Sequence, residues 1–348
     1  MLIIKIFALT TRGLEAVSAR EMAGLPGTTI TETAYRRVAA TYEGSPTALL
    51  NLRTVDDLYL DIISWTGVGH TRDMLAAMKT WSAQLDLTAA AQICAAIRPI
   101  HPQPLFSVTA SFVGKRNYSA DEIKNAAAEG IASRYPWIYT ADDREADFNI
   151  RIFIEHETAY IGVRLGKSPL HERGYKQAQR AGSLKPPVAA AMLQLAEVAP
   201  GHALLDPCCG AGTILIEAAL MGAVAIGGDL DAEAVSAARA NANAANVAGA
   251  NVDIQTWDAR ALPIPDQSIN RIVTNLPWGR QIVVDEPLEI FYGDVCAEME
   301  RVLAPGGRIA ILTSTPQLLR FNQLRQDRAI EISLFGQTPT IALYASIR

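Results

Sequence analysis

Long apolar runs are absent from this 348-residue chain. No uninterrupted apolar stretch reaches the ~18 residues that a membrane-spanning helix needs. The apolar run at residues 1–7 is too short for a signal peptide, and it lacks a basic start and a small-residue cleavage site. We therefore expect a soluble globular protein whose first residues form a buried strand.

Cysteine is scarce as well. The four thiols show neither the spacing of metal ligands nor the pattern of a disulfide-rich secreted domain. They are Cys94, Cys208, Cys209 and Cys296. This usage favours a reducing compartment, so we expect a cytoplasmic protein that holds no metal ion.

Basic residues do not dominate the composition. The chain has 31 Lys and Arg against 36 Asp and Glu, which gives a net charge of -5 and a pI near 5.6. This balance argues against a protein that binds polyanions over its whole surface, although a local basic patch is compatible with it.

The chain is long enough for two or three domains, and its first half has an α+β pattern. Segments rich in β-forming residues alternate with helical ones in the order βαββαβ, which predicts a ferredoxin-like domain over residues 1–66. The expected strands are residues 2–8, 28–31, 37–42 and 58–65, and the expected helices are residues 14–22 and a short one capped by Ser45.

A second α+β module is expected over residues 67–166. Ser119 and Glu122 form a capping box for a helix that ends near Arg134. The other expected elements are a mostly helical stretch at 72–98, a strand at 106–113, and a hairpin built from residues 148–154 and 160–165. No group of residues with the chemistry of catalysis stands out here, so this half is expected to be structural or to recognise a partner.

A basic strip at residues 164–185 joins the two halves, and a linker is predicted at residues 167–185. Its six cations face one acid, Glu172, and such a run can contact phosphates. They are Arg164, Lys167, Arg173, Lys176, Arg180 and Lys185. Charge alone fits a solvated linker equally well.

Strands and helices alternate from about residue 186, which favours a doubly wound, Rossmann-like parallel sheet over residues 186–348. The pattern predicts seven strands, the last two forming an antiparallel edge after a helix-stop turn at 303–308. The strands are residues 203–206, 223–228, 252–254, 271–274, 309–313, 330–334 and 340–347.

A ligand site is expected at the turn after the first of these strands. Gly210 and Gly212 let the backbone approach a ligand and leave N–H groups at the start of a helix free to bind it. Asp229 ends the second strand, where such folds place an acid on a pair of ribose hydroxyls. Asp231 is the better N-cap for the helix at 232–245, which leaves Asp229 for ribose.

The ligand should carry a positive end. Leu215 stands where a dinucleotide motif has its third glycine, and Asp206 would repel a pyrophosphate. S-adenosylmethionine fits both features. The predicted cofactor-binding residues are Asp206, Cys208, Gly210, Gly212, Thr213, Asp229, Leu230, Asp258, Ala259 and Asn275. Among them Cys208 is expected to pack beside the cofactor, and the pair at 258–259 to read the adenine amino group.

The fourth strand ends in Asn275-Leu276-Pro277-Trp278, which we predict to be the catalytic tip. The Asn275 side-chain oxygen and the Leu276 carbonyl can hold both hydrogens of an exocyclic amine and aim its nitrogen at a sulfonium methyl. Pro277 fixes the backbone, and Trp278 offers a face for an extruded base. Catalysis would then be mostly positioning.

Two rival methylation chemistries lack their residues. Attack at carbon 5 of a pyrimidine needs a thiol near the tip, and the closest downstream one is Cys296, on an expected helix. Ribose methylation needs a lysine-centred set with carboxylates, and none stands out.

Three motifs resemble class I amino-methyltransferases. They are Asp206-Pro207-x-x-Gly210-x-Gly212-Thr213, Asn275-x-Pro277-Trp278-Gly279 and Leu303-x-Pro305-Gly306-Gly307. Together with His171-Glu172-Arg173-Gly174-Tyr175 and Lys185-Pro186-Pro187, they make nearly the whole chain resemble THUMP-domain RNA methyltransferases. The resemblance implies a THUMP module at 67–166 that holds the acceptor end of a tRNA, and methylation of guanine N2. The nearest resemblance is to the acceptor-stem guanine-6 enzymes.

The chain departs from the family pattern at three positions. Leu276 replaces a commoner second proline, Ala211 stands where serine is frequent, and Asn270 stands where an acid often precedes the strand. Ribosomal RNA guanine and adenine N6 stay open as alternative targets, because an amine-aiming tip does not distinguish them. A third alternative is an RNA-binding protein with a catalytically silent domain, against which the intact set of Gly210, Gly212, Asp229 and Asn275 argues.

Overall fold

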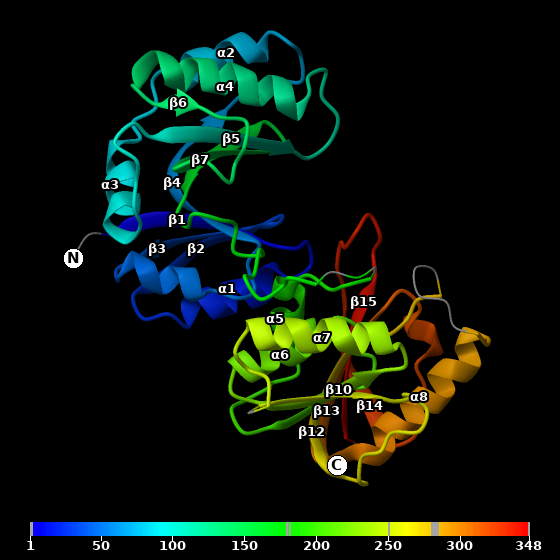
Figure 1. Cartoon of the computed structure of the whole chain (residues 1–348). Helices are drawn as coiled ribbons and strands as arrows, with labels where there is room; N and C mark the ends of the chain where they lie inside the picture. Colours follow the sequence, from blue (N-terminus) through cyan, green and yellow to red (C-terminus); the bar gives the residue numbers. More distant parts are fainter. Residues whose placement is uncertain (1–2, 179, 181, 250, 280–284, 347–348) are drawn as a thin grey trace. The chain divides into compact units, whose positions relative to one another are not determined.

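The computed structural model describes residues 3–178, 180, 182–249, 251–279 and 285–346. The chain divides into two compact units (Figure 1). Unit 1 comprises Met1–Thr10 and Ser18–Leu170, and unit 2 comprises Thr11–Val17 and His171–Arg348. Among the described residues, no helix has the length and apolar character that crossing a membrane would require.

Unit 1 is built on one eight-stranded sheet with the order β2-β3-β1-β4-β8-β7-β5-β6. Its strands are β1 (Ile4–Leu9), β2 (Thr28–Ala34), β3 (Arg37–Tyr42), β4 (Asp57–Thr66), β5 (Leu105–Phe112), β6 (Ile138–Tyr139), β7 (Phe148–Glu155) and β8 (Thr158–Arg164). The first four strands pair antiparallel in the order expected of a ferredoxin-like unit. In place of the expected second helix lies the 3-10 helix η1 (Pro46–Asn51), whose N-cap Ser45 makes no side-chain capping bond.

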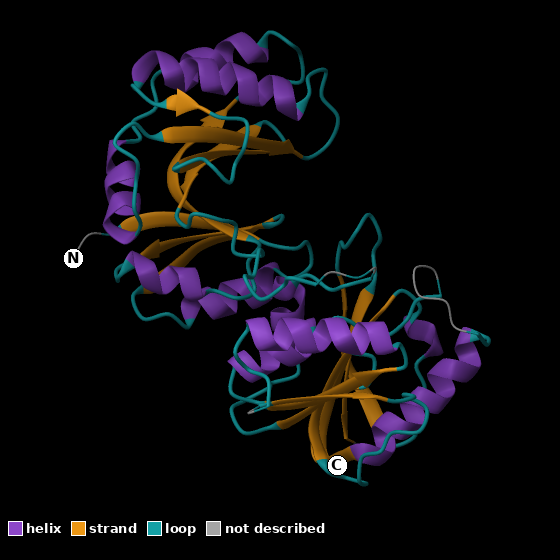
Figure 2. Ribbon diagram, in the orientation of Figure 1, coloured by secondary structure: helices purple, strands orange, loops and turns teal. Residues whose placement is uncertain are grey.

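Strand β4 pairs with β1 on one side and β8 on the other, so the sheet continues through the predicted boundary at residue 66. That boundary stays a prediction. The helices of this part of the chain are α1 (Glu15–Ala23), α2 (Met74–Ser82), α3 (Thr88–Ile97) and α4 (Ala120–Arg134). The capping box at Ser119 is confirmed. Helices α2 and α4 lie together over the sheet (Figure 2), and a Cβ on Gly130 would come within 2.3 Å of the Lys79 carbonyl.

Unit 2 contains the doubly wound sheet, and its seven strands confirm the expected fold class. The strand order is β11-β10-β9-β12-β13-β15-β14. The strands are β9 (Ala203–Asp206), β10 (Val224–Asp229), β11 (Val252–Thr256), β12 (Ile269–Asn275), β13 (Leu303–Thr313), β14 (Leu324–Glu331) and β15 (Thr340–Ser346). The first five run parallel and β15 is antiparallel to its neighbours. The strand order reverses between β9 and β12, which is where such sheets bind ligands.

Helices cover both faces of this sheet (Figures 1 and 2). They are α5 (Pro186–Leu195), α6 (Thr213–Leu220), α7 (Ala232–Ala244) and α8 (Leu288–Val302). One apolar core contains residues of α5, α6 and α7, together with Leu14 and Val17 from the N-terminal segment of this unit. A second core contains the inner face of α8.

The expected helix-stop turn at residues 303–308 is wrong. Strand β13 starts directly after α8, at Leu303. Ile269 pairs with Leu303 and Arg271 already pairs with Arg308, so the residues between Leu303 and Arg308 form a bulge inside the strand. Gly306 supplies the left-handed backbone of that bulge, with φ of 74°. The antiparallel edge is confirmed, although β14 begins at Leu324, earlier than expected. Residues 2 and 347 of the expected strands lie outside the described residues.

Candidate active site

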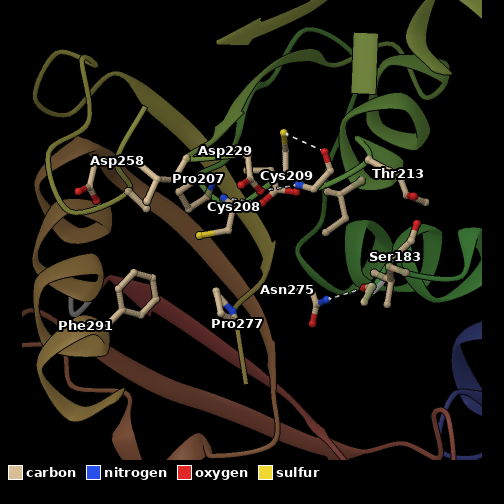
Figure 3. Close-up of a pocket in the computed structure, with 18 of the residues that line it drawn as sticks. Ser183, Pro207, Cys208, Cys209, Thr213, Asp229, Asp258, Asn275, Pro277 and Phe291 are labelled. Atoms are coloured by element: carbon tan, nitrogen blue, oxygen red, sulfur yellow. Dashed lines mark hydrogen bonds between the residues drawn. The ribbon is translucent and has the colours of Figure 1, made fainter. Parts of the chain in front are cut away.

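A cavity of about 290 Å³ opens in unit 2 at the carboxyl ends of β9, β10 and β12 (Figure 3). Its walls are residues drawn from the stretches 182–184, 206–214, 229–230, 258–260, 275–277 and 285–291. This is the position expected for the ligand site of a doubly wound sheet, and the size is near the lower end for small-molecule sites.

The turn after β9 brings bare backbone to the cavity. Gly210 and Gly212 adopt positive φ angles of 51° and 79°, which L side chains rarely adopt. A Cβ on Gly210 would meet nothing within 4 Å, whereas one on Gly212 would press on Ala238 at 3.0 Å. Gly210 and Thr213 line the cavity, and Gly212, the N-cap of α6, shapes the turn behind it.

Asp229 ends β10 and faces the same cavity. Its Oδ2 accepts a hydrogen bond from the Gly210 N–H at 2.9 Å, and its Oδ1 accepts one from the Asp231 N–H at 3.0 Å. Because an ionised carboxylate offers about four acceptor positions, two backbone bonds leave capacity for a ligand. Asp231 caps α7, as expected, by accepting from the Glu233 N–H. Leu230, which is 69% exposed, also lines the cavity.

The acid Asp206 and the thiols of Cys208 and Cys209 line the cavity. Asp206 is 1% exposed, and burial raises its pKa to about 7. Its Oδ1 accepts from the Cys208 N–H at 3.3 Å. Burial also raises the pKa of the Cys208 and Cys209 thiols, so both stay protonated at neutral pH.

The stretch after β11 forms another wall. Trp257 donates its indole N–H to the Pro207 carbonyl at 3.0 Å, which ties this stretch to the turn after β9. Asp258 and Ala259 line the cavity, as predicted, and hydrogen bonds from Arg260 lower the pKa of Asp258. Arg260 also donates to Glu286 at 2.6 Å. The cavity positions of Arg260, Glu286 and Phe291 were not predicted from the sequence.

The tip of β12 contributes Asn275 and Pro277 to the cavity. The Asn275 amide nitrogen lies 3.5 Å from the Gly182 carbonyl (Figure 3). Its Oδ1 is buried and has no hydrogen-bond partner among the residues that the structure describes. Leu276 is 1% exposed and does not line the cavity. Trp278 is also absent from the lining and packs half-buried against the core under α5 and α6.

The basic strip is mostly engaged with the protein itself. For Arg164 the phosphate prediction is wrong: the residue is 3% exposed and donates to Asp57 at 2.7 Å and Asp143 at 2.6 Å. Lys167, also in unit 1, is exposed and donates to the carbonyls of Glu145 and Ala146.

In unit 2 the strip is fastened to helices α6 and α7. Arg173 and Tyr175 both donate to Glu217, at 3.4 and 2.7 Å, and Glu217 is fully buried. Arg180 pairs with Asp231 and Glu233. These pairs place the strip on the protein surface as a packed segment and not as a solvated linker.

The end of the strip forms a wall of the cavity, which the sequence did not predict. Residues 182–184 line it, and Lys176 donates to the Leu184 carbonyl at 2.6 Å. Asn241 of α7, which is 1% exposed, bonds both the N–H and the carbonyl of Ala178 and also donates to the Ala211 carbonyl. A buried Asn in an otherwise alanine-rich helix is a signal that could have pointed to this bridge.

Comparisons with known proteins match both units. Residues 173–333 match the family model for an RMKL-like methyltransferase domain, and residues 86–164 match the THUMP domain. The tRNA (guanine(6)-N2)-methyltransferase of Thermus thermophilus is 34% identical over 218 residues, which are 62% of this chain and 64% of that protein. The chain thus matches less than two thirds of the length of that curated relative.

Solved structures show the same fold over the whole chain. The crystal structure of TrmN from Thermus thermophilus has a TM-score of 0.81 and 27% identity, covering 99% of this chain and all of the other. A putative methyltransferase, SMU.472, complexed with SAH, has a TM-score of 0.75 at 18% identity, covering 100% of this chain and 99% of that one. The chain is therefore similar to a THUMP domain over residues 86–164 of unit 1 and to an RMKL-like methyltransferase domain over residues 173–333 of unit 2.

Proposed function

We propose that this protein transfers a methyl group from S-adenosylmethionine to the N2 amine of a guanine in tRNA, at position 6 of the acceptor stem. One observation carries the proposal. The buried Asn275 Oδ1, without a partner among the described residues, lies on the same cavity as the glycine turn and Asp229. An orphaned buried acceptor costs free energy unless a ligand satisfies it, and an exocyclic amine is such a ligand.

The cavity residues fit S-adenosylmethionine. Bare backbone at Gly210 leaves room for close approach, and the Asp229 carboxylate keeps acceptor positions for the ribose hydroxyls. Asp206 is buried beside them and suits the cationic amino group of the methionine part. Asp258 and Ala259 remain our candidates for reading the adenine. When bound, the cofactor supplies an electrophilic methyl group on a sulfonium.

The residues at the tip would aim the amine. The lone pair of an amine on a base is delocalised into the ring, so the nitrogen attacks well only from a fixed orientation. Asn275 Oδ1 and the Leu276 carbonyl would accept its two N–H groups, and the fixed φ of Pro277 would hold that carbonyl in place. Positioning of this kind supplies most of the rate.

The choice of tRNA rests on the relatives. The relative from Thermus thermophilus that is 34% identical is named for guanine 6 of tRNA, and the THUMP domain of unit 1 suits an RNA substrate. We also propose that the protein works in the cytoplasm, in keeping with its four free cysteines.

Incubation of the protein with methyl-labelled S-adenosylmethionine and, in separate reactions, with an unmodified tRNA or ribosomal RNA transcript tests the proposal. Nucleoside mass spectrometry should find N2-methylguanosine, and a transcript with adenine at position 6 should stay unlabelled. Asn275→Ala, which should transfer the methyl group far more slowly, serves as the matched control. Labelled N6-methyladenosine, or label only in ribosomal RNA, would contradict the substrate. If no RNA is methylated, the enzyme hypothesis fails and the alternative of an RNA-binding protein is favoured.

A further inference from the structure

Tyr292, on the inner face of α8, forms a hydrogen bond with the catalytic tip. It is fully buried, and its hydroxyl lies 3.0 Å from the Pro277 carbonyl and 2.7 Å from Thr313 Oγ1. Thr313 is the last residue of β13, the strand that pairs with β12. One buried hydroxyl therefore joins the ends of two neighbouring strands to a helix.

The direction of these hydrogen bonds follows from the chemistry of the groups. A carbonyl can only accept, so Tyr292 donates its single hydrogen to Pro277. Thr313 must then donate to Tyr292, and Thr313 Oγ1 in turn accepts from the Thr315 N–H at 3.0 Å. The hydrogen bonds therefore all point toward the catalytic tip: Thr315 N–H donates to Thr313, Thr313 to Tyr292, and Tyr292 to the Pro277 carbonyl.

The peptide that carries the Leu276 carbonyl is held from both sides. On one side the Leu276 N–H donates to the Leu312 carbonyl of β13 at 3.2 Å. On the other side the Pro277 carbonyl accepts from Tyr292. The proline ring fixes φ but leaves ψ free, and the bond to Tyr292 restrains that remaining torsion.

We propose that Tyr292 is a positioning residue for methyl transfer, which orients the Leu276–Pro277 peptide so that its carbonyl can aim the target amine. The inference rests on the proposed function. It assigns to α8 a role in the reaction that does not require α8 to touch the substrate at this point.

Tyr292→Phe removes the donor and keeps the ring. We expect the single-turnover rate of methyl transfer to fall about tenfold, since small misplacements of a reacting group are costly. The dissociation constants for cofactor and tRNA should change less than about twofold, because the bond serves orientation alone. Tyr344→Phe is the matched control. Tyr344 lies in β15, its hydroxyl donates to Gln326 at 3.3 Å, and the variant should transfer the methyl group at the wild-type rate.

Substitutions at Thr313 test the same chain of hydrogen bonds independently, and Thr313→Val alone decides the question if Tyr292→Phe folds poorly. Thr313→Val should slow transfer, and combining it with Tyr292→Phe should add little, because both act through one bond. Thr313→Ser keeps the donor and should restore the rate. A wild-type rate for Tyr292→Phe or, if that variant does not fold, for Thr313→Val would overturn the inference, as would parallel losses of rate and cofactor affinity. If the wild-type protein methylates no RNA, the proposed function fails first.

Discussion

Removing the Asp229 carboxylate should weaken cofactor binding. In the free protein this carboxylate already accepts from the N–H groups of Gly210 and Asp231, at 2.9 and 3.0 Å. With cofactor bound it would also accept from the ribose hydroxyls. Asp229→Ala therefore removes direct contacts and loosens the turn that shapes the cavity.

The magnitude follows from the bonds. A hydrogen bond to a charged group contributes about 1.5–3 kcal/mol. We expect a net loss of about 2–3 kcal/mol in cofactor binding, roughly 30- to 150-fold in the dissociation constant. S-adenosylhomocysteine should lose as much as S-adenosylmethionine, because the two share the ribose and differ at the sulfur.

Calorimetric titration with both ligands measures this effect. Asp231→Asn is the matched control: it removes a carboxylate two residues away, yet asparagine caps a helix as well as aspartate does. Its affinity should stay within about threefold of wild type. Unchanged affinity in Asp229→Ala would refute ribose binding by this acid and leave it as a support for the turn.

Three further predictions concern other parts of the site. Because burial raises the pKa of Asp206 to about 7, it is protonated below that pH, and affinity for the cationic cofactor should fall by up to about tenfold per pH unit below 7. Calorimetry should find this dependence abolished in Asp206→Asn. Arg173→Met should lower the free energy of unfolding in urea by about 3 kcal/mol, since it strips a cation from the fully buried Glu217; an unchanged midpoint would contradict the pair. Asn275→Ala should slow methyl transfer about a hundredfold with intact binding, whereas Trp278→Ala loses about 1–3 kcal/mol of RNA affinity only if the ring turns out from the core to stack on a base.

Local sequence patterns predicted the fold well where the physics is local. The turn after β9 needs positive φ at Gly210 and Gly212, and the structure has both. The capping box at Ser119 likewise depends on residues three positions apart. The doubly wound sheet follows from the alternation of buried strands and helices along residues 186–348, and each element of that alternation is a local pattern.

Contacts between distant residues were beyond such patterns. Arg164 looked like a free cation because its partner Asp57 lies 107 residues away. Arg260 and Glu286 meet across 26 residues to close a wall of the cavity. Trp278 was assigned a stacking face from its neighbours, yet tertiary packing places the ring against the core. The Pro-Gly-Gly sequence at 305–307 favours a turn and a bulge alike, and only the pairing of β13 with the distant strand β12 decides for the bulge.

The engagement of the basic strip changes what RNA binding should look like. If all six predicted cations contacted phosphates, the logarithm of the binding constant would fall with the logarithm of salt concentration with a slope of about five. In the structure, however, Arg164, Arg173 and Arg180 lie against carboxylates, which already neutralise them. A neutralised cation releases few counterions, so we expect the three lysines of the strip to contribute a slope of only about two to three. Lys185, the N-cap residue of α5 beside the cavity wall at 182–184, is our candidate contact.

Lys185→Gln should therefore lower the salt slope of tRNA binding by about one unit and leave cofactor affinity unchanged. Arg180→Gln is the control, because its guanidinium is paired with Asp231 and Glu233 and its loss should change the slope little. Fluorescence anisotropy of labelled tRNA across a salt series measures both. A large slope that Arg180→Gln reduces as much as Lys185→Gln would mean that RNA breaks these ion pairs on binding. RNA binding could break such pairs at little cost, since exposed ion pairs contribute only about 0–1 kcal/mol. The comparison of the two variants therefore decides whether Arg180 stays paired with protein carboxylates in the complex.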